Sequence, residues 1–251
     1  MTTIQNIIKQ ADALLTPEKF QDYCPNGLQV AGRNEVNKII TGVTACQALL
    51  DQAVNEKADV VLAHHGYFWR DENPCIVGMK RKRIATLIEH DINLIAYHLP
   101  LDAHPVYGNN VQLAKKLGLE IELAPDRKVT DLVFVCSLPS PMSANDFIAH
   151  VAQCLQRQPL HIPGNAKTIN KIALCTGGAQ DYFQQALKFD VDAFLTGEIS
   201  ESVVHMARET GIDYIAAGHH ATEKYGIQAL GEYLAQKLNV EHKFINIENP
   251  V

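Results

Sequence analysis

Strand-like and helix-like segments alternate along almost the whole chain. The apolar runs at 38–43, 59–65 and 92–98 are typical of strands buried inside a sheet. The segments between them, 45–58 and 83–90, carry apolar residues at helical spacing. Because helices that separate successive strands cover the faces of a parallel sheet, this order predicts an α/β fold with mostly parallel strands.

The second half continues the same order after a strand-like run at 131–138. Further strands are expected at 171–178, 192–198, 212–220 and 242–247, and further helices at 143–158, 180–189, 200–210 and 222–238. Ser143 is the expected N-cap of the first of these helices.

The two halves also contain similar segments. The stretch NKIITGVTACQALLDQAVNEKADVVLAHHG begins at Asn37 and resembles NKIALCTGGAQDYFQQALKFDVDAFLTGE, which begins at Asn170. A second similar pair, 92–102 and 212–223, follows in the same order. Since internal repeats indicate duplicated structural units, the sequence predicts two pseudo-duplicated α/β domains, the first at 1–125 and the second at 126–251.

Ionisable side chains stand where the expected strands end. In the first half these are His64, His65, His98 and Asp102, and in the second half Glu198, His219, His220 and Glu223. Ligands of open α/β sheets bind at the carboxyl ends of the strands, and imidazole with carboxylate is a usual ligand set for zinc, iron or manganese. One interpretation is therefore a metal site. The other is that the histidines are structural and hydrogen-bond to the backbone.

Spacing narrows the candidate ligands. On a helix, His219 and Glu223 are four residues apart and share a face, whereas His220 is rotated about 100° away. Adjacent residues of an extended strand point to opposite faces. His64 and His65 therefore serve one site only if the strand ends there, or if each binds a different ion. A carboxylate that bridges two ions suits a pair of metals about 3.5 Å apart.

The segment HLPLDAHP at 98–105 adds Asp102 to the candidates. Pro100 breaks regular structure after the strand, and the loop expected there would turn the Asp102 carboxylate into a cleft. His98 and His104 flank it, as further ligands or as groups behind the ligands.

Charge and cysteine content argue against several classes of protein. A net charge of −6 and a pI near 6.0 disfavour a broad nucleic-acid-binding face, so no long nucleic acid is expected as a partner. The six cysteines form no C-x-x-C pair and fit buried thiols in a reducing cytoplasm. A signal-peptide pattern and a run of the ~20 apolar residues that span a bilayer are both missing, so we expect a cytoplasmic location without membrane partners.

Two further motifs can each be interpreted in two ways, one structural and one functional. GMKRKR at 78–83 is a solvated loop or helix start, or else a patch that contacts phosphate. CTGGAQ at 175–180 is a tight turn, or else a loop that cradles phosphate.

Together these motifs resemble the Nif-three-like family, also called the GTP cyclohydrolase I type 2 family, and in particular its short bacterial members. The resemblance covers nearly the whole chain except about 120–165. It is carried by NGLQV at 26–30, TGVTA at 41–45, ADVVLAHHGYFW at 58–69, GMKRKR, HLPLDAHP, GNN at 108–110, CTGGAQ, DAFLTGE at 192–198 and AAGHHATEKYG at 217–226.

The resemblance implies a Nif-three-like fold of two interlinked α/β domains with a two-metal site between them. By motif, the implied ligands are His64, His65, Asp102, His219 and Glu223. Family members also resemble one another in forming ring-shaped homohexamers, so a homohexamer is expected here. The two divalent ions could be zinc, iron or manganese, and the substrate is left open by the resemblance.

The main functional hypothesis is a metal-dependent hydrolase, cyclohydrolase-like, that acts on a nucleotide-like small molecule. A metal-bound water of lowered pKa would attack the substrate, and His98 and Glu198 are the candidate catalytic residues that move protons. Two alternatives remain. One is a non-catalytic metal-binding ring or scaffold, and the other is a metal-dependent phosphodiesterase that acts on damaged nucleotides.

Overall fold

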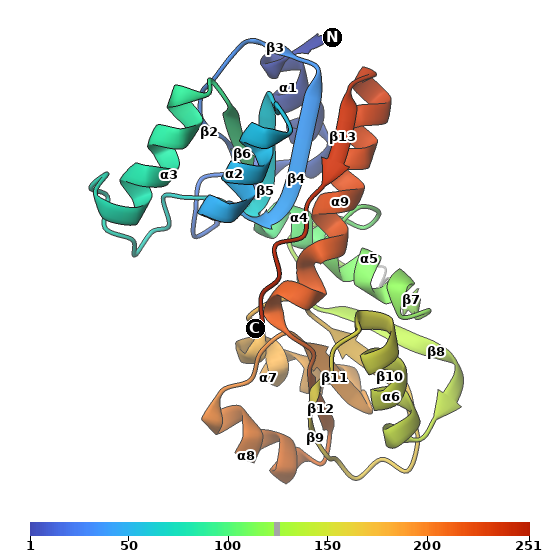
Figure 1. Ribbon diagram of the computed structural model, residues 1–251. Helices are drawn as coiled ribbons and strands as arrows, with labels where there is room; N and C mark the ends of the chain where they lie inside the picture. The colour runs from blue at the N-terminus through green and yellow to red at the C-terminus, as the bar shows by residue number, and fades with distance from the viewer. Residues whose placement is uncertain (123–125) are drawn as a thin grey trace. The chain divides into compact units, whose positions relative to one another are not determined.

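A computed structural model describes residues 1–122 and 126–251 of the chain, whose helices and strands are labelled in Figure 1. Its contacts divide the chain into two units. Unit 1 comprises residues 1–101 and 227–248, and unit 2 comprises residues 102–226 and 249–251. Residue 125, at the expected boundary between domains 1–125 and 126–251, lies outside the described residues, and that boundary stays a prediction.

Unit 1 is built on a five-stranded sheet. In spatial order its strands are β13 (Glu241–Phe244), β4 (Lys38–Thr44), β5 (Val60–His65), β6 (Asn93–Ala96) and β2 (Gly27–Val30). The first four run parallel, and β2 pairs antiparallel with β6 at the edge. A two-stranded ribbon of β1 (Thr2–Thr3) and β3 (Glu35–Val36) and a short turn of 3₁₀ helix, Pro17–Lys19, complete the N-terminal part.

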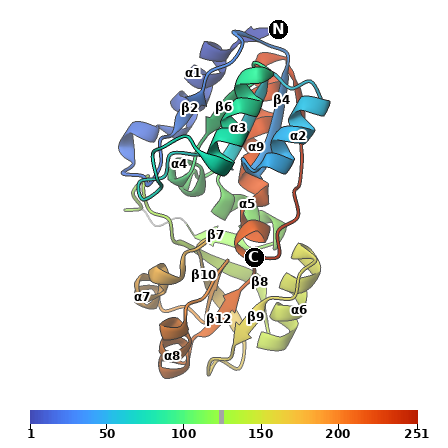
Figure 2. The ribbon, with the colours of Figure 1, turned by 60° about the vertical axis from the view of Figure 1, so that its left-hand side comes forward.

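Helices cover both faces of this sheet. On one face, α1 (Ile4–Leu15) and the later part of α9 (His219–Leu238) pack against Val60 and Leu62 of β5. On the other face, α2 (Gln47–Asn55) and α3 (Gly78–Glu89) pack against Val61 and Ala63 of the same strand. Figure 2 shows α2 and α3 in front of the strands. Because successive residues of β5 enter opposite cores, residues 60–63 of the strand are all apolar.

Unit 2 contains a six-stranded sheet. Its spatial order is β7 (Glu120–Glu122), β8 (Phe134–Met142), β10 (Ile169–Leu174), β11 (Ala193–Thr196), β12 (Asp213–Ala216) and β9 (Leu160–Ile162). The three strands β10, β11 and β12 run parallel, whereas the remaining pairs are antiparallel. The α/β fold with parallel strands at the centre of each sheet is therefore confirmed, and the antiparallel strands lie at the edges.

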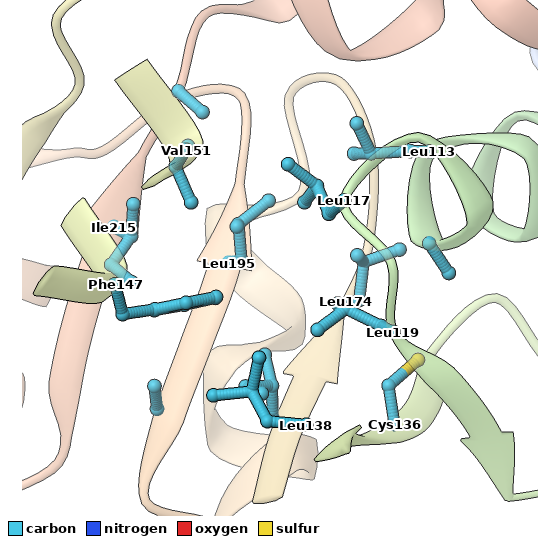
Figure 3. Packing of buried hydrophobic residues seen from close by; sticks show 14 of the residues in the cluster. Leu113, Leu117, Leu119, Cys136, Leu138, Phe147, Val151, Leu174, Leu195 and Ile215 are labelled. Carbon is cyan, nitrogen blue, oxygen red and sulfur yellow. The ribbon is translucent and has the colours of Figure 1, made fainter. Parts of the chain in front are cut away.

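The larger core of unit 2 lies between this sheet and two helices, α5 (Asn109–Lys116) and α6 (Ala144–Leu155). Figure 3 shows Phe147 and Val151 of α6 facing Leu195 and Ile215 of the central strands. On the opposite face, Phe183, Phe194 and Tyr214 form a cluster of aromatic rings with centroids 5.2–5.5 Å apart.

The single helix expected at 180–189 is broken in the structure. It consists of a 3₁₀ turn, Gln180–Tyr182, then α7 (Phe183–Ala186) and a second 3₁₀ turn, Leu187–Phe189. The segment ends at Asp190, whose φ of 50° lies in the left-handed region and stops helical hydrogen bonding. The next helix, α8 (Glu201–Thr210), is continuous.

The internal duplication is visible in the strand order, which is β4-β5-β6-β2 in unit 1 and β10-β11-β12-β9 in unit 2. The same hydrogen bonds recur in both copies. Oδ2 of Asp59 accepts from the main-chain N–H groups of residues 37–38 at 2.8 and 3.1 Å. Oδ2 of Asp192 accepts from those of residues 170–171 at 2.9 and 2.8 Å. The Ala/Val-Asp step shared by the two sequence segments is thus a clamp between neighbouring strands.

Within the described residues, every helix is too short or too polar to cross a membrane.

Candidate metal centre

His64 lies fully buried near the end of β5, and its ring orientation is set by a main-chain carbonyl. Its Nδ1 lies 2.9 Å from the carbonyl oxygen of Tyr97. A carbonyl can only accept a hydrogen bond, so Nδ1 carries the proton and Nε2 is the nitrogen able to bind a cation. Such a contact behind a histidine is the usual way in which proteins orient a metal-binding imidazole.

The rings of His64 and His65 lie side by side, although consecutive residues of an extended strand point to opposite faces. Their ring centroids are 4.5 Å apart, so both rings lie at the same end of the strand, as they can only where the strand stops. Nδ1 of His65 lies 3.1 Å from the hydroxyl oxygen of Thr44 on the neighbouring strand β4. Gly66 then allows the turn, because a Cβ at that position would overlap the side chain of Gln29.

His98 joins this pair as a third imidazole of unit 1. Its ring centroid lies 5.2 Å from that of His64 and 5.8 Å from that of His65. One nitrogen of each ring lies within 4.8 Å of the others. Unit 1 therefore brings together three of the histidines that the sequence singled out.

His219 and Glu223 occupy the first turns of α9 in unit 2. Nε2 of His219 lies 3.1 Å from Oε2 of Glu223, and Nδ1 lies 2.6 Å from Oε1 of Glu198. Burial alone would lower the pKa of His219, but the hydrogen bonds and charges of both carboxylates outweigh it and raise this pKa to about 9. The main-chain N–H of His220 donates to the carbonyl oxygen of Val251 at 3.0 Å.

Asp102 lies on α4 (Leu99–Ala103), a short helix where the sequence predicted a loop. Pro100 is tolerated there because the first helical turn leaves its N–H groups without intrahelical partners. Oδ1 of Asp102 accepts a hydrogen bond of 2.8 Å from the side-chain amide of Asn109. In unit 2, a carboxylate oxygen of Asp102 lies within 4.8 Å of one of Glu223.

The donors of unit 2 fit a divalent cation. Asp102 and Glu223 are 7% and 3% exposed, and two buried carboxylates so close together are costly unless a positive charge accompanies them. Their field also acts on Cys175, whose thiol pKa is raised well above its usual value by burial first and then by these two charges. Hard oxygen donors with one imidazole suit zinc, iron or manganese.

Gly177 closes the space around these donors. Its φ of 72° lies in the left-handed region, and a Cβ there would overlap Oε1 of Glu223 and approach Nε2 of His219 to 3.2 Å. The neighbouring N–H groups already have side-chain acceptors, because Thr176 donates to Asn110 and Gly177 donates to Thr222. These bonds favour the tight-turn interpretation of CTGGAQ over the phosphate cradle.

We expect Gly177→Ala to lower the affinity for a divalent ion at least about 10-fold, because Glu223 must move. Gly118→Ala is the matched control, since its φ is 67° but nothing lies within 4 Å of the added Cβ. In both variants an alanine with φ in the left-handed region costs about 1 kcal/mol of stability. Both should therefore unfold at a lower temperature than the unmodified protein. Titration against a fluorescent chelator measures the affinities, and equal affinities in the two variants would contradict this account.

The basic segment 78–83 forms the first turns of α3, as the helix-start interpretation predicted. Lys80 is nearly buried and pairs with Glu72 at 3.1 Å. The sequence reasoning did not select Asp22, whose Oδ1 lies 2.7 Å from Nδ1 of His98. The two residues are separated by 76 positions in the chain, so no local spacing could have linked them.

Comparison with known proteins gives consistent matches over the full length. A family model described as Duf34/NIF3 (NGG1p interacting factor 3) matches residues 2–250. A Pseudomonas aeruginosa protein named GTP cyclohydrolase 1 type 2 homolog is 56% identical over 249 residues, which cover 98% of each chain. A solved structure named protein ybgI, of unknown function, superposes with a TM-score of 0.95 at 45% identity over 100% of both chains. The structure of TTHA1606 from Thermus thermophilus gives a TM-score of 0.89 at 33% identity, again over 100% of both chains.

Proposed function

The chain belongs to the Duf34/NIF3 family, and from this premise we propose that it is a metal-dependent hydrolase of a nucleotide-like small molecule. The observation that carries the proposal is the buried carboxylate pair of Asp102 and Glu223, with the imidazole of His219 held 3.1 Å from Glu223. Buried charge of this kind is costly for stability and is typical of a functional site.

The proposed ligands of two divalent ions are His64 and His65 from unit 1 and Asp102, His219 and Glu223 from unit 2. Support comes from each unit separately. In unit 1, Nδ1 of His64 donates to a main-chain carbonyl oxygen, so Nε2 is the nitrogen that would bind a cation. In unit 2, Nδ1 of His219 donates to Glu198, and Nε2 of that ring would likewise be the ligand atom. Bound divalent ions would supply an activated water and polarise the group under attack.

Two residues are proposed to handle protons. Glu198 is 36% exposed in its side chain while Oε1 accepts from His219, so its second oxygen can exchange a proton with solvent or substrate. His98 lies beside the rings of His64 and His65, and its Nδ1 is hydrogen-bonded to Asp22, so Nε2 is the nitrogen that would transfer a proton.

The proposal also includes a ring-shaped homohexamer in the cytoplasm. The six free thiols support a reducing compartment.

The test is formate and phosphate release from GTP by protein loaded in turn with zinc, manganese and iron(II). We expect formate release that depends on the metal and stops when a chelator is added. If metal-loaded protein releases neither formate nor phosphate from GTP with any of these ions, the hydrolase proposal fails and a non-catalytic metal-binding role replaces it. Hydrolysis of a simple phosphodiester without formate from GTP would instead favour the phosphodiesterase alternative.

A further inference from the structure

His98 is held at both its backbone and its ring by two residues of the segment before β2. Oδ1 of Asp22 lies 2.7 Å from Nδ1 of the ring, and Oδ2 accepts from the N–H of Leu99 at 2.9 Å. Asn26 donates to Oδ2 of Asp22 at 2.9 Å, and its own carbonyl oxygen accepts from the N–H of His98 at 2.8 Å. The three side chains therefore form a closed set of hydrogen bonds within unit 1.

Asp22 acts in this set as an ionised acceptor. Its side chain is 4% exposed, and burial alone would raise its pKa. The hydrogen bond and charge of His98, with hydrogen bonds from Asn26 and the N–H of Tyr23, outweigh burial and lower the pKa. An ionised carboxylate accepts only, so Nδ1 of His98 must carry a proton.

The remaining surroundings of the ring restrict its motion. Trp69 packs against it edge-on with centroids 5.0 Å apart, and the centroid of the His64 ring lies 5.2 Å from it. The His98 side chain is still 15% exposed, so a small reactant can reach it.

The nearby thiol of Cys24 makes a separate cation site at Asp22 a poor explanation. Cys24, Asp22 and His98 place one donor atom each within 4.8 Å of the others. However, burial first and then the charge of Asp22 raise the pKa of the Cys24 thiol to about 12. A protonated thiol is a poor metal ligand, and both oxygens of Asp22 already accept hydrogen bonds from the chain.

We propose that Asp22, supported by Asn26, is a positioning residue that fixes the Nδ1–H tautomer of His98 and thereby makes Nε2 the proton acceptor in the hydrolysis. This inference rests on the proposed function. Nε2 takes the proton released by the attacking water, and the imidazolium that forms is stabilised by Asp22 through the Nδ1–H bond. Nε2 then returns the proton to the leaving group, as in other carboxylate–imidazole pairs.

The test variant is Asp22→Asn, whose amide must place its NH₂ on one of two sides. Facing Leu99 and Asn26, the NH₂ would oppose two donors. Facing Tyr23 and His98, the NH₂ would also oppose two donors, but His98 can remove one of them by moving its proton to Nε2, which leaves only the N–H of Tyr23. The variant should therefore switch the ring to the Nε2–H tautomer, which cannot accept the proton from water.

The readouts are ¹⁵N NMR of histidine-labelled, zinc-loaded protein and formate release from GTP. The His98 signals are assigned from the spectrum of His98→Gln. We expect the Nδ1–H tautomer in the unmodified protein and the Nε2–H tautomer in Asp22→Asn. We also expect kcat to fall about 10²–10⁴-fold, with KM and metal content unchanged. Glu201→Gln is the control, because it alters an exposed carboxylate–histidine pair, with His205 at 3.1 Å, and should change neither readout.

An Nε2–H tautomer in the unmodified protein overturns the inference, and this measurement needs no substrate and does not depend on the folding of Asp22→Asn. A variant that keeps full turnover, or that loses turnover without the change of tautomer, also overturns it. If the unmodified protein shows the Nδ1–H tautomer but releases no formate, the hydrolase proposal fails while the tautomer result still shows that Asp22 orients the ring.

Discussion

The variant Glu223→Ala is expected to lose at least one metal ion per subunit and at least about 100-fold in turnover, while the proposed homohexamer stays intact. The side chain is 3% exposed and lies 3.1 Å from His219 and within 4.8 Å of Asp102. The variant therefore removes a negatively charged metal donor that lies close to both His219 and Asp102 in unit 2. Elemental analysis, formate release and size-exclusion chromatography measure the three quantities.

Glu232→Ala is the matched control for this experiment. Glu232 lies on the same helix α9 and is exposed, with its carboxylate bonded to Gln228 at 2.9 Å. It should keep its metal and its turnover. If Glu223→Ala instead dissolves the assembly together with metal loss, the ions are structural. Retention of metal and turnover in Glu223→Ala would remove Glu223 from the site altogether.

Asp102→Asn is expected to stabilise the metal-free protein and to destabilise the zinc-loaded protein. Two charges about 5 Å apart repel by about 3 kcal/mol at an effective dielectric constant near 20, and the imidazolium of His219, whose pKa is raised to about 9, offsets only part of this repulsion. In the metal-free protein this repulsion with Glu223 disappears in the variant, and the hydrogen bond from Asn109 can persist through the amide oxygen. The metal-free variant should thus melt higher than the metal-free parent.

With zinc bound, the order should be the opposite, because the variant has lost a charged ligand and gains less from binding. Each kcal/mol shifts the melting temperature of a chain of this size by roughly 2–4 °C, which thermal melts with chelator and with excess zinc resolve. Glu201→Gln removes an exposed charge and should leave both curves unchanged. A variant that is less stable than the parent in both states would indicate that Asp102 is a structural residue.

The central strands could be predicted from sequence because both of their faces are buried. Strands expected at 38–43, 59–65 and 92–98 are observed as β4, β5 and β6 at 38–44, 60–65 and 93–96. The edge strand β2 has less contrast, with Leu28 and Gln29 partly exposed. The pairing of β13 with β4 joins residues about two hundred positions apart, and no local pattern encodes such a contact.

The geometry around the candidate ligands was predictable only where a helix determined it. The four-residue spacing of His219 and Glu223 places them on one helical face, as observed. Strand alternation could not tell whether His64 and His65 face the same way, because that depends on where β5 ends. No sequence motif or spacing around Asp22 indicates a functional role. Its role depends on a contact with His98 that the chain creates only after the sheet has formed.

The central claim is that five side chains distant in sequence bind a pair of divalent ions in one centre. Anomalous diffraction from crystals of the manganese- or zinc-loaded protein tests it most directly. The account predicts two peaks about 3.5 Å apart, within bonding distance of His64, His65, Asp102, His219 and Glu223. Peaks elsewhere would contradict it, and so would an Asp102 carboxylate more than about 12 Å from the His64 ring, beyond any shared coordination sphere.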